Sequence, residues 1–265
     1  MHWVTLMKNW DADLYLKFAD ERTRPAQELL ARIAIANPRR VIDLGCGPGN
    51  STALLRQRWP DAEVIGLDNS PDMIAAAARD YPDGKWIVAD IGSWSDTVPF
   101  DVIFSNAALH WVPNHRSLLP TLIQLVTAGG ALAMQMPRHL DSPVHQLILE
   151  IASRPEWRHL MEQARAVVTV HDPPLYYDML QPFAARIEVW ETIYHHVMDG
   201  PAAIVEWIRG TGLRPFLQAL PGESERRRFE ELLLAGVTAA YPRQPDGRVL
   251  FPFRRLFFLA YRADS

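Results

Sequence analysis

The chain has 265 residues, of which 48% are hydrophobic and 22% charged. This composition is typical of a folded globular protein and excludes intrinsic disorder, collagen-like repeats and a coiled coil along most of the length. The 27 basic and 31 acidic side chains give a net charge of −4, so the overall field does not favour nucleic acid or an acidic membrane surface as a partner.

Cysteine content and hydropathy indicate the cellular compartment of the protein. The single cysteine, Cys46, excludes an intramolecular disulfide, and no apolar stretch approaches the roughly 18 residues that a membrane span needs. The first fifteen residues lack the apolar segment of a signal peptide. We therefore expect a cytoplasmic protein. As a separate expectation, the protein has no obligate protein partner.

The first half of the chain alternates short apolar segments with helical stretches, a pattern that predicts a parallel β-sheet. The helical spacing of Leu29, Leu30 and Ile33 indicates a helix over residues 25–36, and Ser70 followed by Pro71 is typical of a helix N-cap and first helical position. The expected strands cover residues 41–44, 63–67, 85–88, 101–105 and 130–136.

After Pro137 the alternation ends, and the pattern predicts extra helices around two late strands. We expect these helices to form a cap that closes over a substrate. The expected elements are a helical segment over 142–166 interrupted by Pro155, a loop at Pro173-Pro174, a strand over 186–197, helices over 201–220 and 224–241, and a strand over 249–261.

The most informative segment is the apolar strand 41–44, which runs directly into the glycines Gly45, Gly47 and Gly49. Glycine is needed where the backbone turns tightly and a ligand approaches closely. The spacing G-x-G-x-G departs from the dinucleotide fingerprint, and Asp43 lies two residues before the first glycine. A carboxylate at that point suits the ammonium and sulfonium groups of S-adenosylmethionine better than a pyrophosphate.

Two further acidic residues follow the next two strands. Asp68, followed by Asn69, could accept hydrogen bonds from the hydroxyls of a ribose, and Asp90 could receive an adenine amino group beside an apolar contact from Ile91. Without the glycine loop, a helix N-cap or a turn would be the simpler interpretation of both acids. With it, three strand ends point at one crevice, where the ligands of open α/β sheets bind.

Residues 41–50 and 100–106, together with Asp68 and Asp90, resemble the successive motifs of the class I S-adenosylmethionine-dependent methyltransferases. The resemblance implies an α/β fold: a Rossmann-like, seven-stranded, mostly parallel sheet with helices on both faces. We expect a core over 1–137 with an N-terminal lid at 10–18, and over 138–265 the helical cap inserted around the last two strands. The residues expected at the cofactor are Tyr15, Asp43, Gly45, Gly47, Gly49, Asp68, Asn69, Asp90, Ile91 and Asn106.

A closer resemblance covers nearly the whole chain. The segments 10–15, 18–25, 106–112, 136–139, 207–215 and 251–257 are similar to the family of trans-aconitate 2-methyltransferases. This implies methyl-ester formation on one carboxylate of a tricarboxylic acid, with S-adenosylhomocysteine as the other product. Segment 106–111 also resembles the malonyl-carrier-protein methyltransferases, so that substrate remains an alternative, as does a nonenzymatic S-adenosylmethionine-binding protein.

The implied chemistry requires positioning more than acid–base catalysis. A carboxylate is ionised at pH 7 and is itself the nucleophile, so no general base is needed. A tricarboxylate does need local cationic groups, and arginine forks suit carboxylates. The arginines could instead be solvated surface charges, and His110 could be a satisfied core histidine. The candidates for substrate binding are Arg22, Arg24, His110, Arg138, His139, Tyr177 and Arg254 or its neighbour Arg255.

We expect no metal site and no nucleophile at two other features of the sequence, the adjacent histidines and the single cysteine. His195 and His196 are adjacent on an expected strand and would point to opposite faces, and no metal-binding motif accompanies them, so we expect no metal. Cys46 lies in the glycine loop without a motif for nucleophilic catalysis, and we interpret it as a small filler.

Overall fold

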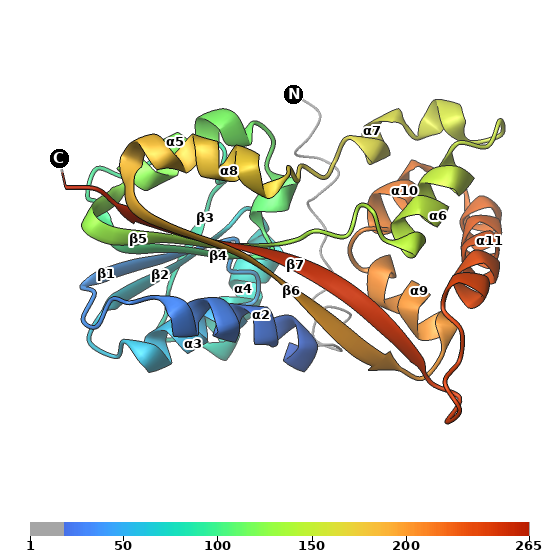
Figure 1. Ribbon diagram of the computed structural model, residues 1–265, viewed down its shortest axis with the longest axis horizontal. Coiled ribbons are helices and arrows are strands. Elements are labelled where there is room, and N and C mark those ends of the chain that lie inside the picture. Colours follow the sequence, from blue (N-terminus) through green and yellow to red (C-terminus); the bar gives the residue numbers. More distant parts are fainter. Residues whose placement is uncertain (1–18, 265) are drawn as a thin grey trace. The chain divides into compact units, whose positions relative to one another are not determined.

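The computed structural model describes residues 19–264, with side chains from Thr23 onward (Figure 1). A seven-stranded sheet has the order β3-β2-β1-β4-β5-β7-β6. Strands β1 to β5 run parallel to one another and β7 is antiparallel to β5, which confirms the predicted mostly parallel α/β fold. The strands are β1 Arg40–Leu44, β2 Glu63–Asp68, β3 Lys85–Val88, β4 Phe100–Asn106, β5 Val126–Pro137, β6 Ala184–Met198 and β7 Val249–Arg262.

Helices cover both faces of the sheet because the chain reverses its direction of travel across it. From β1 the chain passes through α3 to β2 and through α4 to β3, and right-handed crossovers place both helices on one face. From β4 it passes through α5 to β5 in the opposite direction, so α5 lies on the other face (Figure 1). The helices of these layers are α2 Ala19–Arg32, α3 Asn50–Arg58, α4 Pro71–Asp80, α5 His115–Gln124 and α8 Pro173–Leu180.

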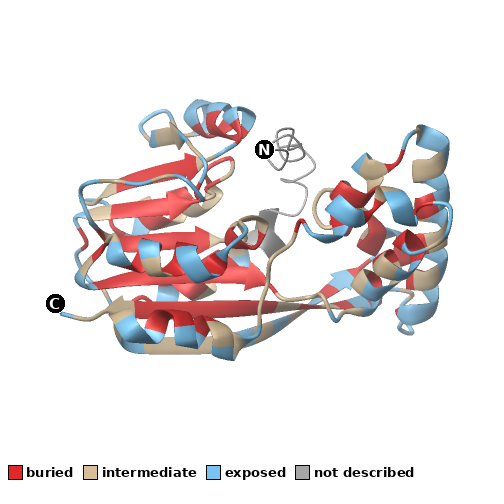
Figure 2. Ribbon diagram, turned by 90° about the horizontal axis from the view of Figure 1, so that it is seen from above, coloured by how far each residue is buried: buried red, intermediate tan, exposed pale blue. Residues whose placement is uncertain are grey.

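The main apolar core lies between the sheet and the layer of α5 and α8. Ile42, Ile103 and Leu132 are completely buried there, in one cluster with Leu119 of α5 and Tyr176 of α8. Each fully buried aliphatic side chain of this kind contributes roughly 1.5–3 kcal/mol to the free energy of unfolding. Figure 2 shows long buried stretches in the strands of the sheet, and these are the strands β1, β2, β4, β5 and β7, whereas β3 and β6 are mostly half-buried or exposed.

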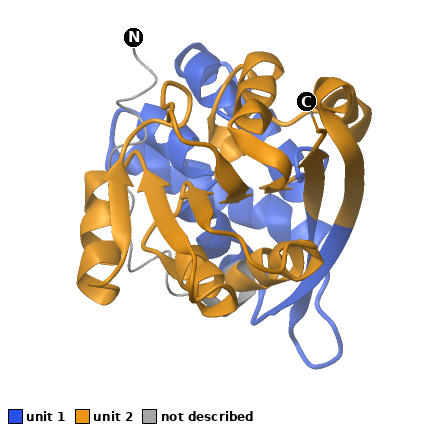
Figure 3. Cartoon of the chain, turned by 90° about the vertical axis from the view of Figure 1, so that its left-hand side faces the viewer, with its two compact units in different colours: residues 1–6, 138–168, 192–254 blue, residues 7–137, 169–191, 255–265 orange. Residues whose placement is uncertain are grey.

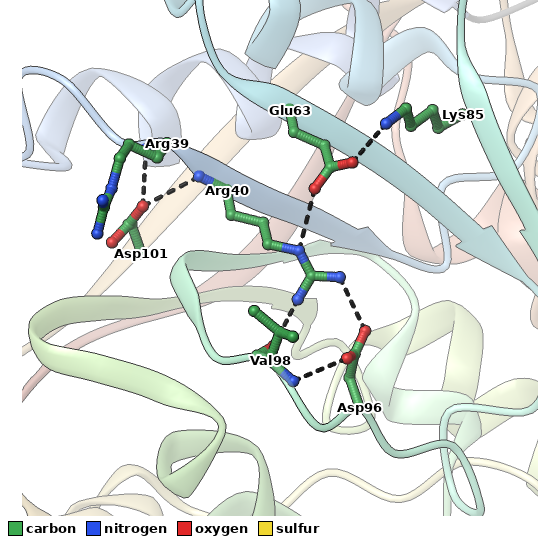
Figure 4. Close-up of polar contacts among 7 residues, drawn as sticks. All are labelled: Arg39, Arg40, Glu63, Lys85, Asp96, Val98 and Asp101. Atoms are coloured by element: carbon green, nitrogen blue, oxygen red, sulfur yellow. Dashed lines mark hydrogen bonds and ion pairs between the residues drawn. The ribbon is translucent and has the colours of Figure 1, made fainter.

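A charged network ties together the amino ends of the central strands (Figure 4). Arg40 donates from Nε to Glu63 at 3.1 Å and from Nη2 to Asp96 at 3.0 Å, and its guanidinium lies 4.1 Å from the ring centre of Phe100. Asp101 accepts the backbone N–H groups of residues 39 and 40 at 2.7 and 3.0 Å. This network lies at the amino ends of the strands, whereas the glycine loop follows the carboxyl end of β1. The network fixes the register of these strands.

The chain divides into two compact units, coloured separately in Figure 3. One comprises the described parts of 7–137, 169–191 and 255–265, and it contains strands β1 to β5 with the helices named above. The other comprises 138–168 and 192–254 of the described residues, and β6 and β7 contribute residues to both units. Its helices are α6 Pro143–Ala152, α7 Glu162–Arg165, α9 Pro201–Arg209, α10 Arg214–Ala219 and α11 Glu223–Ala240.

The second unit has its own small core. Helix α11 packs on α6 and α9. Trp157 is almost completely buried, its ring centre lies 5.3 Å from that of Phe229, and its Nε1 donates to Glu225 at 2.6 Å. A buried indole whose N–H is satisfied in this way anchors the loop before α7 to α11.

Several predicted elements differ from the structure. The loop predicted at Pro173-Pro174 is wrong, because α8 begins there; proline is well tolerated in the first turn of a helix, whose N–H groups have no partner within the helix. Helix α2 begins at Ala19, six residues before the predicted start, since its first turns are polar and carry no apolar pattern. The segment 142–166 forms α6, a short 3-10 helix and α7, and 201–220 forms α9 and α10 with Gly210 and Gly212 between them. No helix within residues 19–264 is long and apolar enough to cross a membrane.

Candidate cofactor and substrate site

The glycine loop connects β1 to α3, and its three glycines adopt left-handed backbone conformations. Their φ angles are 74° at Gly45, 55° at Gly47 and 94° at Gly49. A Cβ added at Gly45 would lie 2.1 Å from the Cβ of Ala108, whereas nothing lies within 4 Å of one added at Gly47. Gly45 is therefore required by packing as well as by conformation, and Gly47 presents bare backbone to open space, where a ligand can approach closely.

Asp43 is completely buried at the end of β1. Its Oδ2 accepts the hydroxyls of Ser51 at 2.6 Å and Thr52 at 2.7 Å, which joins the strand to the first turn of α3. Its Oδ1 is buried and has no hydrogen-bond partner within the described part of the chain. Burial, the largest effect, raises the pKa of Asp43 to about 6. A cationic ligand group would supply the missing partner and favour the ionised form.

Asp68 ends β2 and holds the glycine loop in place. Its Oδ2 accepts the N–H of Gly47 at 3.0 Å and its Oδ1 accepts the N–H of Ser70 at 2.9 Å. Burial raises the pKa of this carboxyl, and the backbone hydrogen bonds act in the opposite direction. Each oxygen retains a further lone pair for a ligand hydroxyl. Asn69, the next residue, is exposed.

The segment after β3 carries the polar and the apolar residue expected at the adenine, and the second of them lies near the glycine loop. Asp90 is exposed and its Oδ1 accepts the N–H of Gly92 at 2.8 Å. Ile91 is buried, and its Cδ1 would lie 3.7 Å from a Cβ added at Gly45. The structure thus brings Ile91 to the glycine loop, as the order of the strand ends predicts.

At the end of β4, Asn106 and the residue after it are unusual. The Oδ1 of Asn106 is buried without a hydrogen-bond partner among residues 23–264. Ala107 has a φ of 54°, a left-handed conformation that costs a non-glycine residue roughly 1–2 kcal/mol. Such strain is typical of positions where backbone geometry serves a site.

One residue of this region was not anticipated. Gln135 lies opposite Asn106 in the register of β4 and β5, is completely buried, and neither amide atom has a hydrogen-bond partner among the described residues. A single glutamine within the apolar strand segment 130–136 is the signal in the sequence that could have identified it.

The unpaired polar atoms lie on one face of the sheet. Asp43 pairs with Phe104 of β4, and Asn106 is two residues further along the same strand, so the side chains of all three point to the same side. Gln135 shares that face because it pairs with Asn106. The hydrogen bonds from Ser51 and Thr52 identify it as the face covered by α3. The β1–β4 junction is also where the strand order reverses, the usual ligand site of open α/β sheets.

Candidates for substrate binding occur in both units. In the unit with the glycine loop, His110 is buried just after β4 with its ring centre 4.6 Å from that of Trp111. Tyr177 is 48% exposed on α8, which packs on the sheet face opposite Asp43. Its neighbour Tyr176 is buried instead, bonded to His115 Nδ1 at 2.9 Å. The structure therefore does not bring Tyr177 to the strand-end residues.

In the other unit, three candidates lie close together. The N–H of Arg138 donates to the carbonyl of Arg254 at 2.9 Å, and Arg254 Nη1 forms an ion pair with Asp141 at 3.1 Å. The ring of His139 stacks on Phe253 at a centre-to-centre distance of 4.9 Å. These contacts cluster the two arginines and the histidine on neighbouring strand and loop segments of that unit.

The remaining candidates lie at the start of the chain. Arg24 is exposed near the beginning of α2. Tyr15, the lid predicted at 10–18 and the side chain of Arg22 lie outside the described residues.

His195 is exposed and His196 is buried 4.6 Å from Trp207, as expected of adjacent residues on a strand. No group of three His, Cys, Asp or Glu side chains within the described residues could hold a metal ion. Burial raises the pKa of the Cys46 thiol well above its usual value, so this cysteine is a poor nucleophile.

Comparisons with known proteins agree with the fold and the loop. A family model described as a methyltransferase domain matches residues 41–130. Trans-aconitate 2-methyltransferase of Azoarcus sp. (strain BH72) is 49% identical over 97% of this chain and 100% of that protein. Among solved structures, the YcgJ protein of Bacillus subtilis has a TM-score of 0.58 at 14% identity, covering 91% of this chain and 99% of that one. Haemonchus contortus phosphoethanolamine N-methyltransferase 2, in complex with S-adenosyl-L-methionine, has a TM-score of 0.55 at 16% identity, covering 91% and 53%.

The sheet order and the glycine loop define a methyltransferase with a Rossmann-like fold. Since a curated relative is 49% identical over almost the whole chain, the family is also clear. The chain belongs to the trans-aconitate 2-methyltransferase family.

Proposed function

We propose that the protein transfers a methyl group from S-adenosylmethionine to a carboxylate of trans-aconitate, giving a monomethyl ester and S-adenosylhomocysteine. The observation that carries this proposal is the 49% identity to a trans-aconitate 2-methyltransferase over 97% of this chain. The geometry supports it, because the strand ends carry acids and bare backbone suited to a cationic nucleoside.

Five groups of the chain fit the cofactor. Asp43 Oδ1 would accept the ammonium of the methionyl part, and Asp68 would accept ribose hydroxyls while it holds Gly47 in place. The backbone of Gly47 would allow close approach, and Asp90 with Ile91 would contact the adenine. When bound, S-adenosylmethionine supplies an electrophilic methyl group on a sulfonium.

The protein's own task in the reaction is to hold the acceptor carboxylate and exclude water. No residue has to remove a proton, because the carboxylate is ionised at neutral pH. Positioning alone can supply a large part of the acceleration of such a transfer. The groups proposed to hold the tricarboxylate are those of Arg22, Arg24, His110, Arg138, His139 and Arg254, and Tyr177 is left out because it lies on the other side of the sheet from Asp43.

The test is incubation of the purified protein with methyl-labelled S-adenosylmethionine and, separately, trans-aconitate, cis-aconitate, citrate, isocitrate and malonyl-carrier protein. Mass spectrometry would follow the labelled ester. We expect a monomethyl ester of trans-aconitate as the main product. Label on the carrier protein alone would overturn the substrate, and S-adenosylmethionine binding without transfer to any acid would indicate a nonenzymatic binding protein.

A further inference from the structure

Gln135 is the most exceptional polar residue of the sheet. Its side chain is completely buried in β5, and both Oε1 and Nε2 are without a hydrogen-bond partner among the described residues. Buried amides are almost always paired, because an unpaired one loses its bonds to water without replacement. A strand position facing a core would be better filled by an apolar side chain. A buried amide kept there in an unpaired state points to a ligand that completes its hydrogen bonds.

The described neighbours of Gln135 in the sheet leave its amide without a hydrogen-bond partner. Phe257 of β7 lies opposite it, and Trp190 stacks on Phe257 with ring centres 4.9 Å apart. The indole N–H of Trp190 is already bonded to Glu28 of α2 at 2.9 Å. The β7 side of Gln135 is therefore apolar, and its polar neighbour in the register is Asn106 on β4, whose Oδ1 is also unpaired.

The position of β5 separates Gln135 from the nucleoside. The residues that fit the cofactor end β1, β2 and β3, whereas β5 lies two strands from β1 on the other side of the point where strand order reverses. At about 4.8 Å between strands, this places its backbone roughly 10 Å from that of β1. A ligand group that extends from the ends of β1 to β3 across β4 would approach the end of β5 that carries Gln135.

The charges around the site indicate which chemical group of a ligand Gln135 would bind. The carboxylates of Asp43 and Asp68 repel an anionic substrate, so a substrate carboxylate needs hydrogen-bond donors from other residues. A primary amide supplies a donor without a charge, and so it can hold a carboxylate without neutralising its nucleophilic oxygen.

We propose that Gln135 is a substrate-binding residue whose Nε2 donates a hydrogen bond to a carboxylate of the tricarboxylate acceptor. This inference rests on the proposed function. Repulsion between Oε1 and the same carboxylate would orient the amide with its Nε2 toward the substrate.

The experiment compares Gln135→Met with wild type and with Gln57→Glu, a control at an exposed position of α3. Methionine keeps the length of the side chain and removes both polar atoms. Titration calorimetry would measure the Kd of S-adenosylhomocysteine, and then the Kd of trans-aconitate in its presence. Initial rates would give KM and kcat, and thermal unfolding would give Tm.

We expect Gln135→Met to raise the Kd and KM for trans-aconitate at least tenfold, while the Kd of S-adenosylhomocysteine stays within twofold and the Tm is unchanged or higher. A merely structural role would instead lower the Tm and leave the two affinities in proportion. Wild-type Kd and KM for trans-aconitate in this variant, or a loss confined to S-adenosylhomocysteine, would overturn the inference alone. A wild-type protein that neither binds nor methylates trans-aconitate would overturn the proposed function and the inference with it.

Discussion

The carboxylate of Asp43 accepts the hydroxyl of Thr52 at 2.7 Å, and both side chains are completely buried. This bond crosses from the end of β1 to the first turn of α3, so it fixes the ends of the glycine loop between them. It also commits one carboxylate oxygen to the protein and leaves Oδ1 for a ligand. The side chain of Asp43 is thus held in place by hydrogen bonds, and its ionisation is unfavourable until a cationic ligand group binds beside it.

The affinity for the cofactor should depend on pH through Asp43. Burial raises its pKa to about 6, so the carboxyl is increasingly protonated below that pH and binds an ammonium less well. We expect the affinity for S-adenosylhomocysteine to rise between pH 5 and pH 7, by up to about tenfold per pH unit, and then to level off. Calorimetry across this range measures it. In Asp43→Asn the affinity should be low and its pH dependence in this window lost; an unchanged profile would contradict the role of Asp43.

Asp68 should affect the cofactor more than the fold. Asp68→Asn keeps one acceptor oxygen for the bond with Gly47 or Ser70 and removes the charge and the second acceptor. We expect S-adenosylhomocysteine to bind at least tenfold more weakly, about 1.4 kcal/mol, in titration calorimetry. Asp72→Asn, at an exposed position in the first turn of α4, is the matched control. Wild-type affinity in Asp68→Asn would refute the ribose contact.

Gly47 and Gly129 offer a pair of substitutions with the same strain and different surroundings. Both have left-handed φ angles, 55° and 71°, and in both nothing lies within 4 Å of an added Cβ. We expect Gly47→Ala and Gly129→Ala each to lower the free energy of unfolding by about 1–2 kcal/mol in chemical denaturation. Only Gly47→Ala should also weaken the binding of S-adenosylhomocysteine, because the methyl group of the introduced alanine would occupy the space through which the ligand approaches. Equal cofactor affinity in the two variants would show that the ligand does not approach Gly47.

The network around Arg40 should govern stability without touching the site. Arg40→Met leaves the carboxylates of Glu63 and Asp96 without the guanidinium they share. We expect the free energy of unfolding to fall by about 1–3 kcal/mol. Arg39→Met is the control, since Arg39 is exposed and its bond to Asp101 uses only the backbone N–H. The affinity for the cofactor should be unchanged in both variants. A large loss of affinity in Arg40→Met would show coupling between the amino and carboxyl ends of the strands.

The tricarboxylate should be sensitive to the arginines proposed to hold it. Arg22→Ala and Arg138→Ala should each be assayed with trans-aconitate, with the exposed Arg248→Ala as control. We expect at least one of the first two to lower kcat/KM tenfold or more, about 1.4 kcal/mol, while the Kd of S-adenosylhomocysteine is constant. Unchanged kinetics in both would remove these residues from the substrate site.

Much of the geometry of the candidate cofactor site was predictable from the sequence because its signals are local. An apolar strand followed by three closely spaced glycines has few other uses, and the register of parallel strands brings the ends of β1, β2 and β3 together. The predicted sheet and the placement of Asp43 and Asp68 at strand ends followed from these short patterns. Prolines were less informative, since the same Pro173-Pro174 pair can mark a loop or begin a helix.

By itself, the sequence determined the parallel sheet, the glycine loop and the acids at the strand ends, because periodicity and glycine spacing act over a few neighbouring residues. Only the tertiary structure decided that Tyr176 rather than Tyr177 faces the core, and that Gln135 stands beside Asn106 with its amide unpaired. Asn106 and Gln135 are on different strands, and their pairing follows from the register of β4 against β5, which no local pattern encodes. Burial and hydrogen-bond satisfaction are properties of the assembled sheet, so the residue that we propose for substrate binding became visible only there.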